Sequence, residues 1–382
     1  MEYRTLGNTG LSVSAIALGC EGFVGKTEEQ TCAEMDFAIS KGINFIDMYT
    51  SNPDLRSNIG KALAERRQQF IIQGHLCTTW ENDQYLRTRD VEKTIASFED
   101  QLTRLHTDYL DIGMIHYVDS EEDFHEVFNG PIIRLALRLK EEGKIRHIGL
   151  SSHNPIVAKL AVESGLIEVL MFSINPCYDL QPPSENVDDL WADESYAHSL
   201  ENIDPEREKL YELCEQKGIG LDVMKAYGGG DLLSETNSPF GKAMTPVQCI
   251  EYALTRPAVA SVMVGCKSCD EMQAAINWCN ATKEEKDYTS VMAGMEKFSW
   301  QGHCMYCGHC APCSVGIDIA SVNKYYNLTI AQNEIPETVR EHYKTLSHHA
   351  SECIQCGQCE TNCPFGVAII EQMEKATEKF GY

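Results

Sequence analysis

Short apolar runs alternate along most of the chain with longer segments in which apolar residues recur at helical spacing. The runs are rich in Ile, Val and Leu on both faces, which is typical of strands in a parallel sheet. Several of the longer segments begin at a Pro, Asp, Ser or Asn and end beside Gly, as helices do. The predicted strands are Ser14–Gly19, Asn44–Tyr49, Phe70–Cys77, Leu110–Tyr117, Arg146–Ser152, Val169–Asn175, Gly220–Lys225 and Ser261–Gly265. The predicted helices are Thr27–Lys41, Arg56–Arg66, Arg89–Leu105, Asp123–Glu142, Pro155–Ser164, Pro205–Lys217, Pro246–Thr255 and Ser268–Asn280.

A strand followed by a helix, repeated eight times, indicates an α/β fold of the (β/α)8 (TIM) barrel type, which typically spans about 250 residues. A turn at Gly7–Gly10 predicts two short strands before the barrel. We expect the barrel to occupy residues 1–285. The long acidic connection Pro176–Asp204 is predicted to be a lid or a contact with a second domain.

Cysteines dominate the rest of the chain, where two runs contain eight of the 17 in the sequence. The run from Cys353 to Pro364 reads C-x2-C-x2-C-x3-C-P. The run from Cys304 to Cys313 has four cysteines, with two residues between each cysteine and the next. Three thiolates at such steps bind one face of a [4Fe-4S] cluster, and the fourth cysteine of each run binds the other cluster. Structural zinc takes C-x2-C pairs but does not explain three cysteines at equal steps. The predicted ligands are Cys304, Cys307, Cys310 and Cys363 for one cluster, and Cys353, Cys356, Cys359 and Cys313 for the other.

The segments between the cysteines favour a small, mainly helical domain over residues 286–382. Ile317–Ile330 and Glu337–Ala350 are predicted helices, and Glu284–Trp300 is predicted to lead out of the barrel as a third. The formal charge of −25 argues against a nucleic-acid partner. We find neither a secretory signal nor an apolar run long enough for a bilayer, so we expect a cytoplasmic protein with reduced cysteines and no membrane partner.

Active sites of such barrels lie where strands end and loops begin, and the motifs there are specific. The segments Tyr3–Ser14, Gly42–Asp47, Asp108–His116 and Ile148–Ser151 resemble the aldo-keto reductases, over about residues 1–280. This resemblance implies a (β/α)8 fold, NADP(H) as hydride carrier and a small-molecule carbonyl or alcohol as substrate. The cysteine-rich tail resembles the ferredoxin-like modules of redox enzymes from anaerobes, and a subgroup of the family with a C-terminal two-cluster domain.

Only half of the family's catalytic tetrad of Asp, Tyr, Lys and His is present. Asp47 and His116 match the Asp and the His, whereas Asn52 stands at the Tyr position and His75 at the Lys position. Tyr49 lies two residues from Asp47, on the same face of a strand, and is one candidate for the displaced acid. His75 is the other, because imidazole exchanges protons near neutral pH. The predicted catalytic residues are therefore Asp47, Tyr49, His75 and His116.

The same positions also allow a metal site. Asp47, His75 and His116 form a two-His, one-carboxylate ligand set, to which His153 and Cys20 or Cys177 are possible additions. An iron or zinc ion held there would polarise a substrate oxygen. This alternative predicts a metal-dependent lyase or isomerase with structural or sensory clusters.

The resemblance also implies a partial nicotinamide site. Ser151 and Ser152 match the polar residues that hold the carboxamide, Asn175 matches a further polar residue, and Tyr227 matches the stacking aromatic. Gly265, Lys267 and Ser268 match the phosphate-binding loop, with Asn277 on the following helix. A helix N-terminus with a lysine suits phosphate, and Lys267 is the one cation that we identify nearby.

The cofactors differ in the number of electrons they carry. A nicotinamide transfers two electrons as hydride and each cluster transfers one, so they need an intermediate carrier or separate partners. We predict an iron-sulfur oxidoreductase acting on a carbonyl or hydroxyl compound, whose clusters exchange electrons with the substrate or with a ferredoxin or similar carrier. Structural clusters are a further possibility, and a non-catalytic electron-transfer subunit remains the non-enzymatic alternative.

Overall fold

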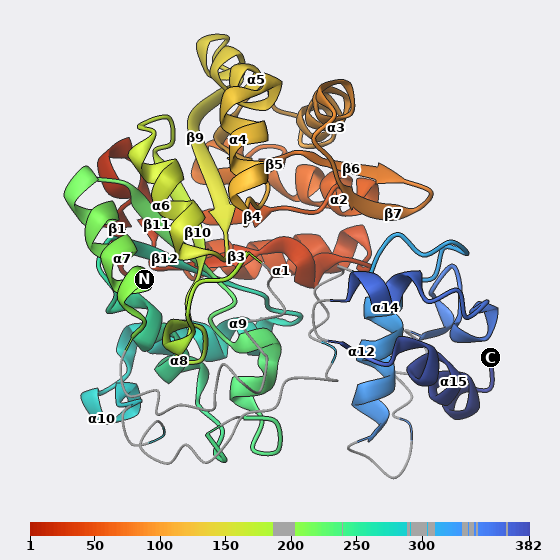
Figure 1. Ribbon diagram of the computed structural model, residues 1–382. Helices are drawn as coiled ribbons and strands as arrows, with labels where there is room; N and C mark the ends of the chain where they lie inside the picture. Colours follow the sequence, from red (N-terminus) through yellow and green to blue (C-terminus); the bar gives the residue numbers. More distant parts are fainter. Residues whose placement is uncertain are drawn as a thin grey trace.

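The computed structural model describes residues 1–185, 203–238, 240–288, 291, 304, 310–330, 335, 340, 343–363 and 366–382. All eight predicted barrel strands form (Figure 1), and they close into a parallel barrel in the order β3-β4-β5-β8-β9-β10-β11-β12. The prediction of a (β/α)8 barrel is therefore confirmed. The strands are β3 (Ile16–Gly19), β4 (Phe45–Met48), β5 (Ile71–Leu76), β8 (Leu110–Ile115), β9 (Ile145–Ser152), β10 (Val169–Ser173), β11 (Gly220–Met224) and β12 (Val259–Val264).

The helices of the barrel differ from the predicted ones mainly at two places. The single helix predicted for Asp123–Glu142 is two helices, because Pro131 lacks an amide hydrogen and favours an extended conformation at Gly130. The second helix begins at Pro53, three residues earlier than predicted, with Asn52 as its N-cap. The helices are α1 (Glu28–Ser40), α2 (Pro53–Leu63), α3 (Val91–Arg104), α4 (Glu121–Asn129), α5 (Pro131–Glu141), α6 (Pro155–Glu163), α7 (Pro205–Lys217), α8 (Pro246–Leu254), α9 (Cys269–Ile276) and α10 (Lys283–Lys286).

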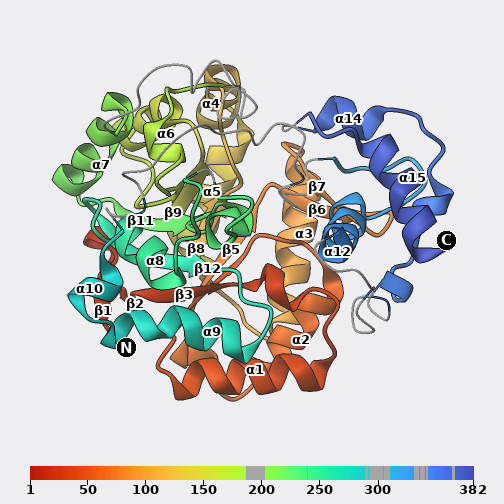
Figure 2. The same cartoon turned by 90° about the horizontal axis from the view of Figure 1, so that it is seen from below.

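Two antiparallel hairpins accompany the barrel. The predicted N-terminal one pairs β1 (Tyr3–Thr5) with β2 (Ser12–Ser14), and its Leu6 and Val13 join the apolar core inside the strands. The second pairs β6 (Thr78–Glu81) with β7 (Gln84–Arg87) and was not predicted. It follows β5 directly, and Figure 2 shows it reaching from the barrel toward the C-terminal helices.

The C-terminal region contains three α-helices joined by turns and loops where the structure describes it, which confirms the prediction of a mainly helical region. Its helices are α12 (Ile319–Ile330), α14 (Gln358–Asn362) and α15 (Ile369–Phe380), and α12 packs against α15. The ring of Tyr343 stacks on that of Phe380, with centroids 3.9 Å apart, in the middle of an apolar cluster. Most of the predicted helix Glu284–Trp300 and of the connection Pro176–Asp204 lies outside the described residues. The predicted helix Glu337–Ala350 is wrong in its second half, because residues 345–348 form a turn and bends and His349 is extended before the short 3-10 helix Ala350–Glu352. The domain boundary near residue 285 stays a prediction.

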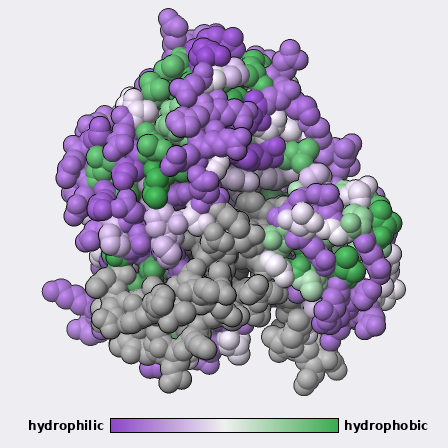
Figure 3. All heavy atoms as spheres, viewed as in Figure 1, coloured by the Kyte–Doolittle hydropathy of each residue, from purple (hydrophilic) through white to green (hydrophobic). Residues whose placement is uncertain are grey.

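The described surface of the barrel helices is mainly hydrophilic in the view of Figure 3. Within the part of the chain that the structure describes, none of the helices combines the length and apolar composition needed to cross a bilayer.

Candidate active site and cluster sites

Three of the predicted catalytic residues lie in one hydrogen-bonded chain at the C-terminal mouth of the barrel. Asp47 is near the end of β4, His75 is on β5, and His116 directly follows β8. His75 Nε2 lies 2.9 Å from Asp47 Oδ1, and His75 Nδ1 lies 2.7 Å from His116 Nδ1. All three side chains are buried. We call Asp47, His75 and His116 the relay.

Two tyrosines surround the outer end of the relay. The hydroxyl of Tyr85, on β7, is hydrogen-bonded to His116 Nε2. Tyr49, the displaced acid that the sequence suggested, stacks parallel to the His116 ring at a centroid distance of 6.0 Å and meets the Tyr85 ring edge-on at 5.8 Å. Tyr85 is the functional candidate that sequence reasoning missed.

The inner end of the relay continues into the barrel. Gln73 pairs with Asp47 in the parallel register of β4 and β5, and its Nε2 donates to Asp47 Oδ1 at 2.9 Å. The same amide lies 3.3 Å from Asp222 Oδ1 on β11. Burial, and then the charge of Asp47, raise the pKa of Asp222 well above its ordinary value. This shift favours the protonated form of the Asp222 carboxyl.

The arrangement gives no support to a single-metal site. His75 uses both ring nitrogens for its neighbours, so the three donors form a line instead of facing a common point. Among the described residues, no group of three His, Cys, Asp or Glu side chains is arranged to hold a metal ion. His153 pairs with Asp119 at 2.8 Å instead of joining the relay. Burial and the charge of Asp47 raise the pKa of Cys20, which favours a neutral thiol.

The predicted nicotinamide residues fall into two groups. Ser151 Oγ and Tyr227 Oη are buried without a hydrogen-bond partner among the described residues, so these two polar atoms fit a bound carboxamide or ring. The side chains of Ser152 and Asn175 already make hydrogen bonds within the protein. Ser152 donates to the Val118 carbonyl at 2.7 Å, and Asn175 bonds the Lys225 carbonyl and the amides of two following residues.

The predicted phosphate loop fits an anion less well. Ser268 caps α9, and the carboxylate of Glu271 accepts the amide hydrogen of Lys267 at 2.7 Å, so a phosphate would have to displace it. Lys267 is not the only cation there, which corrects the sequence analysis: Lys26 donates to the Lys267 carbonyl at 2.6 Å and pairs with Glu34. Gly265 is open to the addition of a Cβ, and Asn277 accepts from Gln273 at 2.9 Å.

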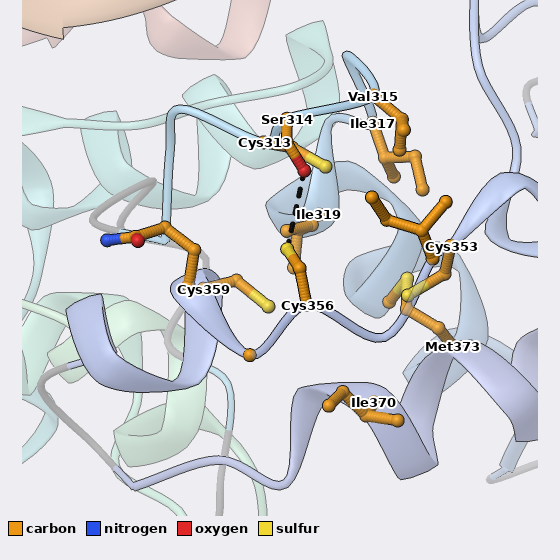
Figure 4. Close-up of a pocket in the computed structure, with 13 residues that line it drawn as sticks. Cys313, Ser314, Val315, Ile317, Ile319, Cys353, Cys356, Cys359, Ile370 and Met373 are labelled. Atoms are coloured by element: carbon orange, nitrogen blue, oxygen red, sulfur yellow. Dashed lines mark hydrogen bonds between the residues drawn. The ribbon is translucent and has the colours of Figure 1, made fainter.

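The four cysteines predicted to bind one cluster line a single pocket of about 360 Å³, which includes space at its open side (Figure 4). A hydrogen bond from Ser314 at 3.3 Å lowers the pKa of Cys356, favouring the thiolate that binds iron. Burial raises the pKa of Cys359 to about 11. Sulfur donors in an apolar lining suit a [4Fe-4S] cluster. The cysteines are Cys313, Cys353, Cys356 and Cys359, and the apolar lining is Val315, Ile317, Ile319, Ile354, Ile370 and Met373.

The other predicted cluster site is only partly described. Cys304, Cys310 and Cys363 belong to or pack against the same apolar cluster as α12 and α15, and Cys307 lies outside the described residues. Among the described residues, the cysteines of the two runs form no disulfide bonds with one another.

The hairpin β6–β7 joins the two sites. Gln84 Nε2 donates to the Cys313 carbonyl at 3.1 Å, and the Cys313 amide donates to Gln84 Oε1 at 2.6 Å. Gln84 therefore holds a predicted cluster ligand, while its neighbour Tyr85 contacts the relay.

A parallel (β/α)8 barrel with polar side chains at its mouth and a cysteine-rich helical module defines the class: a barrel oxidoreductase with an iron-sulfur domain. The chain belongs to the aldo/keto reductase family, whose model matches residues 15–248, and a 4Fe-4S dicluster domain matches residues 300–367. Among relatives, the uncharacterized oxidoreductase YqkF of Bacillus subtilis (strain 168) is 28% identical over 320 residues, 79% of this chain and 99% of its own. L-galactose dehydrogenase of Arabidopsis thaliana is 27% identical over 305 residues, which cover 72% of this chain and 86% of that protein.

A solved structure supports the fold. The holo form of the aldo-keto reductase AKR11C1 from Bacillus halodurans aligns with a TM-score of 0.59 at 24% identity, over 79% of this chain and 99% of that one.

Proposed function

We propose that the protein interconverts a small-molecule carbonyl compound and its alcohol at the barrel mouth, and that its two [4Fe-4S] clusters carry electrons between this site and a ferredoxin-type carrier. The observation that carries the proposal is the unbroken line of hydrogen bonds from Tyr85 through His116 and His75 to Asp47. Such a line can hold a proton at one end and release it at the other.

The electron count fits this reaction. Reduction of a carbonyl to an alcohol takes two electrons and two protons, and two clusters that each exchange one electron together hold two. When bound, the clusters would supply one-electron chemistry, and a reduced nicotinamide would supply hydride. The residues that would hold the clusters are the eight cysteines of the two runs.

The chain's own residues supply the proton chemistry. Burial of the relay excludes water from its interior, so a proton passes through it from residue to residue. Ser151 and Tyr227 offer unpartnered polar atoms that support a bound nicotinamide. The carboxylate of Glu271, on α9, accepts the Lys267 amide hydrogen in the preceding loop, which argues against tight binding of a phosphate there.

The experiment uses anaerobically purified, cluster-loaded protein. NADPH is added without substrate and the cluster absorbance is followed, and the same is done with a chemically reduced ferredoxin. Carbonyl reduction is then measured with both donors on butyraldehyde, benzaldehyde and methylglyoxal, and alcohol oxidation on the matching alcohols. We expect the ferredoxin to bleach the clusters and carbonyl reduction to follow. A protein with reducible clusters that turns over none of these compounds in either direction would contradict the proposal.

A further inference from the structure

The hairpin β6–β7 places one more tyrosine at the reacting end of the relay. Its two-residue turn consists of Asn82 and Asp83, both with positive φ, at 52° and 59°. This left-handed pair is the geometry of a tight hairpin turn, and it brings β7 back over the mouth of the barrel. As a result the Tyr85 hydroxyl reaches His116 Nε2, although the two residues are 31 positions apart in the sequence.

The hydrogen bonds of the relay have a defined direction. An ionised Asp47 only accepts, so His75 Nε2 must donate to it. In neutral His75 the Nδ1 then accepts from His116, whose Nε2 in turn accepts from Tyr85. When Asp47 holds a proton, every bond in the line reverses, and the Tyr85 hydroxyl hydrogen is released to point at a substrate.

The raised pKa of the Tyr85 hydroxyl suits a proton donor. Burial, followed by the neighbouring Tyr117, raises its pKa well above the ordinary tyrosine value, so the hydroxyl stays protonated at neutral pH. Tyr85 is also half-buried, so its side chain is not sealed from solvent.

Gln84 fixes the hairpin from its other side. Neighbouring residues of a strand face opposite ways, so Gln84 faces the C-terminal module while Tyr85 faces the relay. Gln84 is 7% exposed, and both ends of its amide bond the backbone of Cys313. This two-point contact leaves β7 little freedom to move away from the barrel.

We propose that Tyr85 is the catalytic residue that exchanges a proton with the substrate oxygen, and that Gln84 is the positioning residue that holds it in place. This inference rests on the proposed carbonyl–alcohol interconversion.

In the reductive direction the Tyr85 O–H bond breaks and the alcohol O–H bond forms. The protons of the relay each move one place toward Tyr85, and Asp47, protonated at the start, ends as a carboxylate. The two electrons and the carbon-bound hydrogen come from a reduced nicotinamide as hydride, or from a reduced one-electron carrier and solvent. Oxidation of the alcohol runs through the same steps in reverse.

The test compares Tyr85→Phe with Tyr109→Phe in the cluster-loaded protein. Tyr109 packs on Arg67 and Arg146 away from the relay, so its variant controls for loss of a hydroxyl. With the aldehydes above, Tyr85→Phe is expected to lower kcat about 100-fold and to change KM by less than about threefold, because the hydroxyl acts in the transition state. Tyr109→Phe is expected to match the wild type.

A second measurement needs no substrate. In protein with ¹⁵N-labelled histidine, Tyr85→Phe should move the His116 Nε2 signal and leave the His147 signals unchanged, because only His116 loses a hydrogen bond. Gln84→Leu, which keeps the Tyr85 hydroxyl, should retain its iron and still lower kcat about tenfold, because small misplacements of a reacting group are costly. Gln84→Glu keeps the acceptor for the Cys313 amide and should fall between Gln84→Leu and the wild type.

Two outcomes separate this inference from the proposed function. If the wild type is active and Tyr85→Phe is as active as Tyr109→Phe, the role of Tyr85 is wrong while the proposed function stands. If the wild type acts on neither carbonyls nor alcohols, the proposed function fails and the proton-donating role of Tyr85 falls with it.

Discussion

His75 is the residue on which the relay depends, because it alone bonds both of the other members. Replacing it by Ala separates His116 from Asp47, so protons can no longer pass between them. We expect His75→Ala to lower kcat for carbonyl reduction about 100-fold, the usual scale of general acid–base catalysis. Steady-state kinetics on the cluster-loaded protein measure this.

His147→Ala is the matched control for that variant. His147 is on β9 and pairs with Glu168 at 2.8 Å, and it has no contact with the relay among its described hydrogen bonds. It should keep turnover close to that of the wild type. Equal losses in the two variants would mean that His75 matters only for stability.

Asp222 carries a prediction about pH and stability. Its pKa is raised in the folded protein, whereas in the unfolded chain it returns to about 3.9. Stability from such a group is fully present below the unfolded pKa and is lost as pH rises toward the folded pKa. Asp222→Asn removes this loss and keeps an acceptor for Gln73. The variant should therefore gain stability over the wild type as pH rises from 5 to 8, by up to about 1.4 kcal/mol per pH unit.

Denaturant unfolding of both proteins at several pH values measures the difference. A gap between Asp222→Asn and the wild type that stays constant over this range would show that Asp222 is ionised in the folded state.

The sequence predicted the positions of the relay but not its geometry. Asp47, His75 and His116 were predictable because strand ends of a barrel meet at one mouth. Their line of hydrogen bonds was not, because it depends on rotamers and on which nitrogen of each ring faces a neighbour. Gln73 and Asp222 were missed for a related reason: they lie within apolar strands, and only barrel closure brings them together.

At the scale of elements, the barrel strands were predictable from their apolar runs, whereas the hairpin β6–β7 was not. Its sequence from Thr78 to Arg87 is largely polar and lacks the alternation of a half-buried strand. The one usable signal was Asn82-Asp83 between residues that favour strands, since this pair tolerates the positive φ of a tight turn. The split of the fourth helix at Gly130-Pro131 was more visible, because proline rarely continues a helix.

The hairpin turn supports a prediction of its own. A β-branched residue at a positive φ is strained, so Asp83→Val should destabilise the hairpin by about 1–2 kcal/mol. Amide hydrogen exchange across residues 78–87 should become roughly tenfold faster, because the pairing of β6 and β7 opens more often. Asp83→Gly tolerates the same φ and should exchange like the wild type. Unchanged exchange in Asp83→Val would show that contacts outside the turn hold the hairpin.

For the whole molecule, the cysteine spacing predicted which four residues share a pocket, although Cys313 lies in a different run from its three partners. Their meeting in one pocket supports the exchange of the fourth cysteine between runs. The sequence could not show that Cys313 also contacts the barrel, because Gln84 belongs to the hairpin that the pattern missed.

The strongest prediction at this scale concerns the metal content of single-cysteine variants. Wild type purified without oxygen should contain about eight irons per chain, and Cys356→Ala, which removes a ligand from the described pocket, about four. Cys32 lies on α1, outside both runs, so Cys32→Ala should keep all of the iron.

Because the relay belongs to the barrel, the His116 nitrogen signals should be retained in Cys356→Ala, unless loss of the cluster displaces Cys313 and with it Gln84. A variant that loses half of its iron and also shifts the His116 signal, as is expected for Tyr85→Phe, would show that the occupied cluster site helps to hold Tyr85. Iron that stays at the wild-type level in Cys356→Ala would contradict the assignment of this pocket.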